Sequence, residues 1–308
     1  MPRTDDMEHT YIPAFTLTPT ARAVERAKPP EIKTPRFIDD VTAGRVELPT
    51  IPRVVQRLIA ALRDPDIDSR KIAEALSQDP VLSAKVLRVA NSSFFGGQRS
   101  MASIDAAISL IGTQALSRLI MACGVSASFK AVPGIDLKIF WRDALVAGTA
   151  ATRLAPELSA DAEEAYVCGL LHATGHLILC QSYPEIAQAM FAGYDVVRGA
   201  ELAEIELGAF GIDHAEVGAL WVQSLGFPTS VSTTIHKSAR AAAADDTALD
   251  LTLRGACALE IAVASNASAK QALATLSPAL VARFSTNGQP SAAFDKLYES
   301  LVNTEPMV

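Results

Sequence analysis

Two histidines stand four residues apart in the stretch GLLHATGHLIL, residues 169–179. If this stretch forms one helix, His172 and His176 project from the same face, one turn apart. Two imidazoles placed in this way can grip a metal ion such as zinc. The same spacing also suits histidines that only make hydrogen bonds inside a protein core. The pair therefore predicts either a metal site or a structural pair in the core.

Other candidate ligands come before and after this pair. Asp143 precedes it, and His214 and His236 follow it on segments with helical periodicity. Consecutive helices of a bundle can bring such groups together in the interior and build a metal site. In a two-metal hydrolase, the metal ions lower the pKa of a bound water. Such an enzyme also needs a carboxylate that bridges the two ions. The aspartates therefore matter as much as the histidines.

A basic stretch, SAKVLRVANSSFFGGQR, is the second candidate. Lys85, Arg88 and Asn91 follow at intervals of three and share one side of a predicted helix, and Arg99 lies in the glycine loop beyond it. Side chains three apart are neighbours on a helix surface. One interpretation is a surface for a small anion or a protein partner. The alternative, which we favour, is a solvated helix face that ends in a capping asparagine.

The stretch AISLIGTQALSRLI resembles a helix-turn-helix, with Gly112 in the turn. A helix that reads DNA needs several basic or amide side chains on its outer face. This one offers Gln114, Ser117 and Arg118 before it becomes apolar, and the chain carries a net charge of −7. DNA binding needs a positive field, so a DNA-binding regulator is only the third hypothesis.

The composition indicates the fold class and the setting. Apolar residues make up 49% of the chain and aromatic residues only 6%, which favours helices over sheets. No segment is predicted as a strand, and no apolar run is expected to span a membrane. Four scattered cysteines without a CxxC pair indicate reduced thiols. We expect an all-α protein of the cytoplasm that lacks a secretory signal.

The elements that would position these residues fall into four regions. Residues 1–45 carry prolines and mixed charge without an apolar period, so we expect a flexible N-terminal arm. Helical periodicity then predicts a first lobe at 46–130, a second lobe at 136–265 and a helical extension at 266–308.

Local signals predict particular helix boundaries. Asp79 followed by Pro80 marks a helix start, and Gly112 marks a break. Residues 160–181 are predicted as one helix, which would carry both histidines of the pair. Trp141 and Trp221 are expected in the core.

The order of several segments resembles the HDOD domain, the HD-related output domain of bacterial signalling proteins. These segments are LPTIPRVVQRLI, SQDPVLSAKVLRVANSSFFG, SIDAAISLIG, FWRDALVAGTAA, CGLLHATGHLIL, FGIDHAEVGALWVQSLGFP and TTIHK. The resemblance covers about residues 46–265. It implies a two-lobed helical bundle of the HD-superfamily type and a role in signal transduction.

Active members of the HD superfamily are metal-dependent phosphohydrolases with an H…HD…D series of ligands, and this chain departs from that series. Asp143 stands at the first histidine, and His172 is followed by Ala173 instead of an aspartate. Ala256 and Cys257 stand where the final aspartate is expected. The resemblance therefore implies no catalysis, no bound metal and no cofactor.

The remaining histidines fit the family pattern only in part. His214 and His236 match additional histidines of the two-metal relatives, but Lys237 replaces the next one. His176 stands where active relatives carry a cation. Adventitious binding of a divalent metal by Asp143 and these histidines stays open.

We therefore expect a non-catalytic regulatory protein that acts through protein partners. The groove between the two lobes, near Asp143, His172 and His214, is predicted to hold a ligand or a partner segment. The alternative is a divergent metal-dependent phosphohydrolase acting on a nucleotide or cyclic dinucleotide. Neither a membrane nor a nucleic acid is an expected partner.

Overall fold

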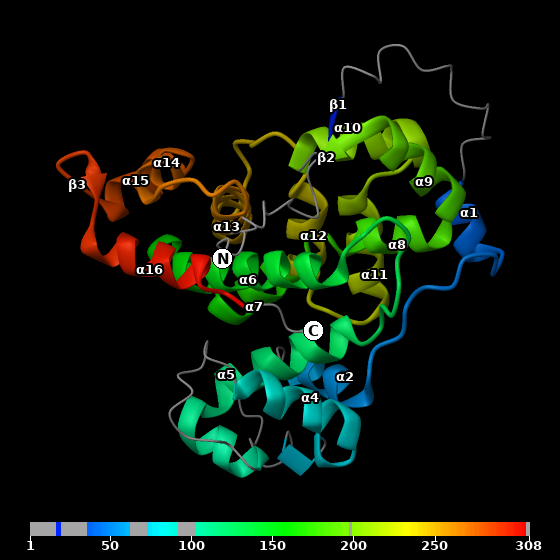
Figure 1. Cartoon of the computed structure of the whole chain (residues 1–308), viewed down its shortest axis with the longest axis horizontal. Helices are drawn as coiled ribbons and strands as arrows, with labels where there is room; N and C mark the ends of the chain where they lie inside the picture. The colour runs from blue at the N-terminus through cyan, green and yellow to red at the C-terminus, as the bar shows by residue number, and fades with distance from the viewer. Residues whose placement is uncertain are drawn as a thin grey trace, which may run out of the picture.

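The computed structural model describes residues 17–19, 36–61, 73–74, 76–91, 103–196 and 199–305. Helices make up nearly all of the regular structure in these ranges, which confirms the predicted all-α class (Figure 1). Two short antiparallel strand pairs were not predicted: β1 with β2, and β3 with β4. Their bounds are Leu17–Pro19, Tyr194–Val196, Ser285–Thr286 and Gln289–Pro290. The second pair turns at Asn287–Gly288, where both φ angles are positive, as hairpin turns require.

The first lobe forms the lower part of Figure 1 and contains three described helices: α2 (Arg53–Ala61), α4 (Pro80–Ala90) and α5 (Ile104–Ser126). Helix α4 begins as predicted, because the Asp79 side chain accepts a hydrogen bond from the backbone of Leu82. Helix α5 breaks as predicted at Gly112, whose φ of 81° favours glycine.

Helix α5 is long and apolar enough, by length and composition, to cross a membrane. The prediction that no stretch has these properties was therefore wrong. The helix is interrupted at Gly112, however, and every residue from Leu119 to Ser126 is buried. It packs against α2 and α4, so it serves as the core helix of the first lobe.

The second lobe supplies the frame of the candidate site. Its helices are α6 (Leu137–Leu158), α7 (Ala162–Leu171), α8 (Thr174–Ser182), α9 (Pro184–Gly193), α10 (Gly199–Phe210), α11 (His214–Ser224), α12 (Thr229–Lys237) and α13 (Ala248–Ala264). Helix α6 packs against α7 and α13, and α8 packs against α11. Glycines make these approaches possible. A Cβ on Gly169 would lie 2.6 Å from the Ala147 carbonyl oxygen, and one on Gly175 only 1.9 Å from that of His214.

The single helix predicted at 160–181 is wrong. Helix α7 ends at Leu171, and α8 begins at Thr174 after a turn at His172 and Ala173. The Thr174 hydroxyl donates to the carbonyl of Leu171, and the close approach of α8 to α11 sets the new direction. His172 and His176 therefore do not share the face of one helix.

The predicted flexible arm contains a docked helix near its end. Helix α1 (Phe37–Thr42) buries Phe37 edge-on against the ring of Tyr183. The Tyr183 hydroxyl donates to the Asp40 carboxylate at 2.7 Å. These tertiary contacts order a stretch that has no apolar period of its own. Apart from β1, residues 1–35 of the arm lie outside the described residues.

The extension contains α14 (Ala269–Ala274), α15 (Pro278–Phe284) and α16 (Ala292–Val302). Helix α16 packs against α6 and α13. Arg142 of α6 holds the following segment, because its Nε donates to the carbonyl of Thr304 at 3.1 Å. The extension is thus attached to the second lobe.

Aromatic side chains join the two lobes. Trp141 and Trp221 are buried, as predicted. Phe129 lies between them, with ring centroids 5.9 Å from Trp141 and 5.8 Å from Trp221. The Trp221 indole donates to the carbonyl of Pro49 at 2.9 Å. The core therefore continues from one lobe into the other.

Candidate functional site

A pocket in the second lobe brings together four of the chemically active side chains. Asp143 of α6, His172 after α7, His214 of α11 and Glu260 of α13 all line it. Its volume is about 60 Å³, which leaves room for a few water molecules. The other lining residues are mostly apolar: Phe140, Ala144, Ala173, Gly199, Leu202, Ser238, Cys257 and Ile261. All of these residues belong to the second lobe, and a ligand site in the groove between the lobes stays a prediction.

The two carboxylates of the pocket are both buried. Asp143 is 3% exposed and Glu260 is 6% exposed. Arg142 lies beside the first of them, with its Nη1 4.0 Å from an Asp143 oxygen. Two buried carboxylates that line a cavity together with two imidazoles mark a candidate binding site.

The tautomer of His172 follows from its backbone contact. Its Nδ1 lies 2.8 Å from the carbonyl oxygen of Gly169. Since a carbonyl can only accept, Nδ1 carries the hydrogen, and Nε2 of the neutral ring is an acceptor. His172 thus lines the pocket in a fixed orientation.

The side chain of His214 is held on the side away from the pocket by the buried carboxylate of Glu206. Its Nδ1 and its backbone N–H donate to the same oxygen of Glu206, at 2.6 Å and 2.8 Å. The other Glu206 oxygen accepts from Nδ1 of His176 at 2.5 Å. Glu206 is fully buried on α10. The signal for it was present, because Leu202, Glu206 and Phe210 occupy one apolar stripe at intervals of four.

These residues, with Cys180, form a buried group that we call the Glu206 cluster. Burial alone would raise the pKa of Glu206, but the imidazoles of His214 and His176 lower it to about 2. Burial alone would lower the pKa of His176, but its contacts with Cys180 and Glu206 raise it to about 10. The cluster therefore contains a carboxylate and an imidazolium. His176 stabilises the core and does not line the pocket.

His236 and Lys237 lie at the end of α12 and do not line the pocket either. His236 is exposed. Lys237 enters a second charged group, the lysine cluster, which consists of Lys237, Asp245, Asp246, Asp250 and Arg254. Its Nζ lies 3.3 Å from oxygens of Asp245 and Asp250 and 3.9 Å from Asp246.

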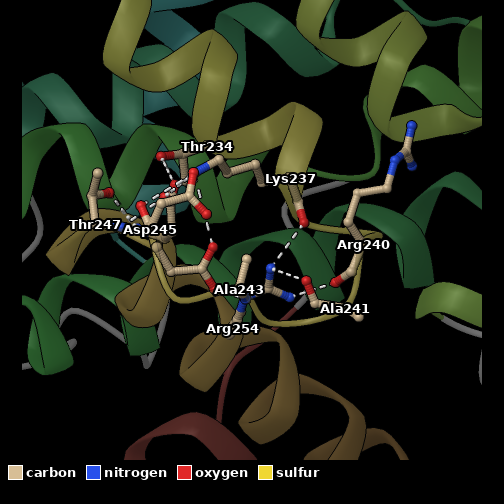
Figure 2. A network of polar contacts seen from close by, with 10 residues as sticks. Thr234, Lys237, Arg240, Ala241, Ala243, Asp245, Thr247 and Arg254 are labelled. Atoms are coloured by element: carbon tan, nitrogen blue, oxygen red, sulfur yellow. Dashed lines mark hydrogen bonds and ion pairs between the residues drawn. The ribbon is translucent and has the colours of Figure 1, made fainter.

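The lysine cluster holds the connection between α12 and α13 in place (Figure 2). Arg254 donates to Asp246 and to the carbonyls of Lys237, Arg240 and Ala241. Figure 2 shows Lys237 turned toward Asp245 on one side and Arg254 reaching these carbonyls on the other. Backbone acceptors at the end of a helix are thus satisfied by a cation.

The predicted basic surface does not form one exposed face. Lys85 donates to the hydroxyl of Ser126 on α5 at 2.9 Å. Asn91 donates to the carbonyl of Leu87 as a helix cap, and Arg88 is exposed. Arg99 lies outside the described residues. The structure thus favours the alternative interpretation, a helix face that ends in a capping asparagine.

The part of α5 after Gly112 lies at the contact with α7. Arg118 forms an ion pair with Glu163 at 2.5 Å and accepts, at its carbonyl, the hydroxyl of Tyr166. The one basic side chain available to this helix is thus paired within the chain, and the following residues are buried. This geometry does not favour a DNA-reading helix.

The donor set of the pocket does not fit the metal centre of the HD superfamily. Ala173 brings a methyl group to the pocket where the family has a ligating aspartate. Burial raises the pKa of Cys257 to about 12, so it stays a neutral thiol and a poor ligand. Among the described residues, no group of three or more His, Cys, Asp or Glu side chains could hold a metal ion. We therefore derive no catalytic step through a metal.

The comparisons with known proteins agree with this fold. The family model of the HDOD domain matches residues 48–241, more than half of the chain. A protein from Shewanella amazonensis SB2B, whose name provisionally calls it a phosphohydrolase, is 26% identical. Its crystal structure gives a TM-score of 0.65 and covers 86% of this chain and 97% of that one.

Two further relatives extend the comparison. The crystal structure of an HDOD domain protein with unknown function from Geobacter sulfurreducens has a TM-score of 0.66 at 22% identity, over 85% of this chain and 91% of that one. An uncharacterized protein from Treponema pallidum (strain Nichols) is 26% identical over 197 residues, which make up 63% of this chain. The match spans only 38% of that relative's length.

Proposed function

The chain belongs to the HDOD domain family, and on this premise we propose that it is a non-catalytic signalling module with a small-ligand pocket and protein partners. The observation that supports this best is the pocket of the second lobe. It keeps Asp143, His214 and Glu260 around a cavity, although the ligand series of a metal hydrolase is incomplete. Polar groups that surround a cavity are the usual mark of a ligand site.

Helix α7 offers a route from the pocket to the first lobe. His172 follows its last residue and lines the pocket, whereas Glu163 in its first turn pairs with Arg118 of α5. We propose that a ligand in the pocket changes how α7 packs against α5. A ligand shifts such an equilibrium only through contacts that differ between two arrangements, and α7 contacts both places.

A divergent metal-dependent phosphohydrolase acting on a nucleotide or cyclic dinucleotide is the second candidate. It is favoured by one observation, the name of the Shewanella amazonensis SB2B protein, which shares 26% of its residues with this chain. Metal analysis separates the two candidates. Stoichiometric iron, manganese or zinc that is lost in Asp143→Ala, together with phosphate release, would support the hydrolase.

Crosslinking in the native cells tests the signalling proposal. We expect the triple variant Asp143→Ala, His172→Ala, His214→Ala to lose the crosslinked partners that the unchanged chain retains. His236→Ala is the matched control, because it removes an exposed imidazole outside the pocket. Circular dichroism checks that the triple variant folds, and Asp143→Asn serves as a milder variant. If every partner persists in a folded triple variant, the pocket has no signalling role.

A further inference from the structure

Two neighbouring segments of the described chain pass between the lobes. Residues 43–52 lead from α1, which is docked on the second lobe, to α2 of the first lobe (Figure 1). Residues 127–136 lead back from α5 to α6. The Ser128 hydroxyl of the second segment donates to the carbonyl of Thr50 in the first segment at 2.7 Å. Two crossings that lie together allow one lobe to rotate against the other while each lobe keeps its own packing.

The second crossing contains a turn where the backbone can absorb such a rotation. The Ile135 N–H donates to the carbonyl of Val132 at 3.2 Å, and Gly134 between them has a φ of 76°. Glycine adopts both signs of φ without a steric penalty, and hinges are a few loop positions that take up changes in φ and ψ. Residues 132–135 are therefore suited to act as the bending point.

Away from the crossings, polar contacts hold α5 of the first lobe against α7 of the second. Arg118 pairs with Glu163 at 2.5 Å, and the two side chains are 24% and 30% exposed. The Tyr166 hydroxyl donates to the carbonyl of Arg118 at 3.0 Å. An ion pair that is open to solvent contributes little free energy, so this side of the junction can separate at a low cost.

The two tryptophans of the chain stand at the crossings and differ in their hydrogen bonds. Phe129 of the second crossing lies between Trp141 and Trp221. The indole of Trp221 donates to the carbonyl of Pro49 in the first crossing at 2.9 Å. The Nε1–H of Trp141 is buried and has no acceptor among the residues that the structure describes. A buried donor without an acceptor costs free energy, so Trp221 stabilises this arrangement of the lobes and Trp141 opposes it.

We propose that residues 43–52 and 127–136 form a hinge, about which the lobes alternate between the described arrangement and an open one. In the open arrangement, the pair of Arg118 with Glu163 is broken, Trp221 leaves the Pro49 carbonyl, and the Trp141 indole gains an acceptor. The balance depends on contacts that differ between the two arrangements. The hinge goes beyond the proposed function, because it acts in the chain without a ligand or a partner.

Relaxation-dispersion NMR of the full chain tests the hinge, because the two indole N–H groups report on it directly. We expect both signals to show exchange with a second state. Glu163→Gln should raise the fraction of that state about two- to fivefold, since it weakens the contact between α5 and α7. Glu164→Gln is the matched control. It changes the next residue of α7, whose carboxylate accepts from Ser230 within the second lobe, and should leave the fraction unchanged.

Replacing each tryptophan separates the hinge from ordinary loss of packing, because the two variants should act in opposite directions. Trp221→Phe removes a hydrogen bond of the described arrangement and should raise the open fraction about fivefold, followed by the Trp141 indole. Trp141→Phe keeps a buried ring and removes the unsatisfied donor. It should lower the open fraction about fivefold, followed by the Trp221 indole.

Three outcomes would overturn the hinge. The first is a single state for both indoles in the unchanged chain. The second is an equal response to Glu163→Gln and Glu164→Gln. The third is a rise of the open fraction in Trp141→Phe, which would mean that this indole already has an acceptor such as a buried water. Circular dichroism checks the folding of each variant, and the two glutamate variants decide the test if a tryptophan variant does not fold.

Discussion

The second lobe contains two groups of acidic side chains that differ in what lies opposite them. In the lysine cluster, Lys237 and Arg254 pair with Asp245 and Asp246 of the α12–α13 connection and with Asp250 in the first turn of α13. In the pocket, Asp143 and Glu260 line a cavity together with imidazoles. Charges neutralised by cations of the same chain hold a loop in place. The pocket carboxylates differ from these in that they line a cavity.

The Glu206 cluster shares one property with each of these two groups. Its carboxylate is neutralised within the chain by His176, as in the lysine cluster, yet its second oxygen orients His214 at the pocket. Carboxylates behind a histidine fix the tautomer and direction of the ring. The comparison therefore distinguishes side chains that contact a ligand from those that position them.

The largest effect is expected where the backbone sets the pocket in place. Gly175→Ala would put a Cβ 1.9 Å from the His214 carbonyl oxygen and 2.6 Å from the Gly218 nitrogen. Backbone atoms cannot yield as a flexible side chain can, so we expect a loss of about 3 kcal/mol or more in the free energy of unfolding. Urea denaturation measures it.

Gly208→Ala is the control for this variant. Nothing lies within 4 Å of a Cβ at that position on α10, so the change should stabilise the helix by up to about 1 kcal/mol. Equal stabilities for the two variants would show that the approach of α8 to α11 is not tight.

The next effect concerns the positioning carboxylate. Glu206→Gln removes the charge that balances His176 in the core and places an amide donor against an imidazole donor. Breaking a buried ion pair at one partner costs about 3 kcal/mol, measured by urea denaturation at pH 6. Glu204→Gln, an exposed change on the same helix, should stay within about 0.5 kcal/mol. Similar values for both would mean that the Glu206 cluster stabilises nothing.

The pH dependence of stability sharpens the same distinction. The raised pKa of His176 stabilises the fold fully below about 6.5, and this contribution falls as the pH rises toward about 10. The lowered pKa of Glu206 stabilises it above about 4.5, and this contribution falls as the pH drops toward about 2. The difference in unfolding free energy between the unchanged chain and Glu206→Gln should therefore be largest near pH 5–6. A difference that is flat from pH 3 to 9 would contradict the charged cluster.

The smallest effect is expected in the lysine cluster. Arg254→Lys keeps the charge but loses the planar fork that reaches Asp246 and three carbonyls. We expect a loss of about 1–2 kcal/mol in the free energy of unfolding, measured by urea denaturation. Arg283→Lys, whose side chain is 62% exposed, is the matched control. Equal losses in the two variants would show that the hydrogen bonds of Arg254 do not stabilise the α12–α13 connection.

Local signals in the sequence predicted several features correctly. Asp79 and Pro80 mark the start of α4, and Gly112 marks the break in α5. A cap or a positive φ depends on residues within one turn of each other, which is why the sequence alone carries these features. The all-α class follows from a helical apolar period that repeats along most of the chain.

The candidate site was predictable only in part. Asp143, His172 and His214 were selected from the sequence, and the structure brings them to one pocket. The pairing of His172 with His176 failed, because α8 turns against α11 at Gly175 and breaks the helix between them. His236 and Lys237 lie outside the pocket as well. Tertiary contacts decide this too, because Lys237 pairs with Asp250 of α13.

By itself, the sequence determined the helices, most of their ends and which polar residues occur among apolar ones. Only the tertiary structure decided what those polar residues face. His176 meets Glu206 thirty positions away, and Asp143 shares a cavity with Glu260 from a distant helix. Helix boundaries depend on neighbours in the chain, whereas the partner of a buried charge depends on how the helices pack. That packing separates the charges that hold the fold from those that line the pocket.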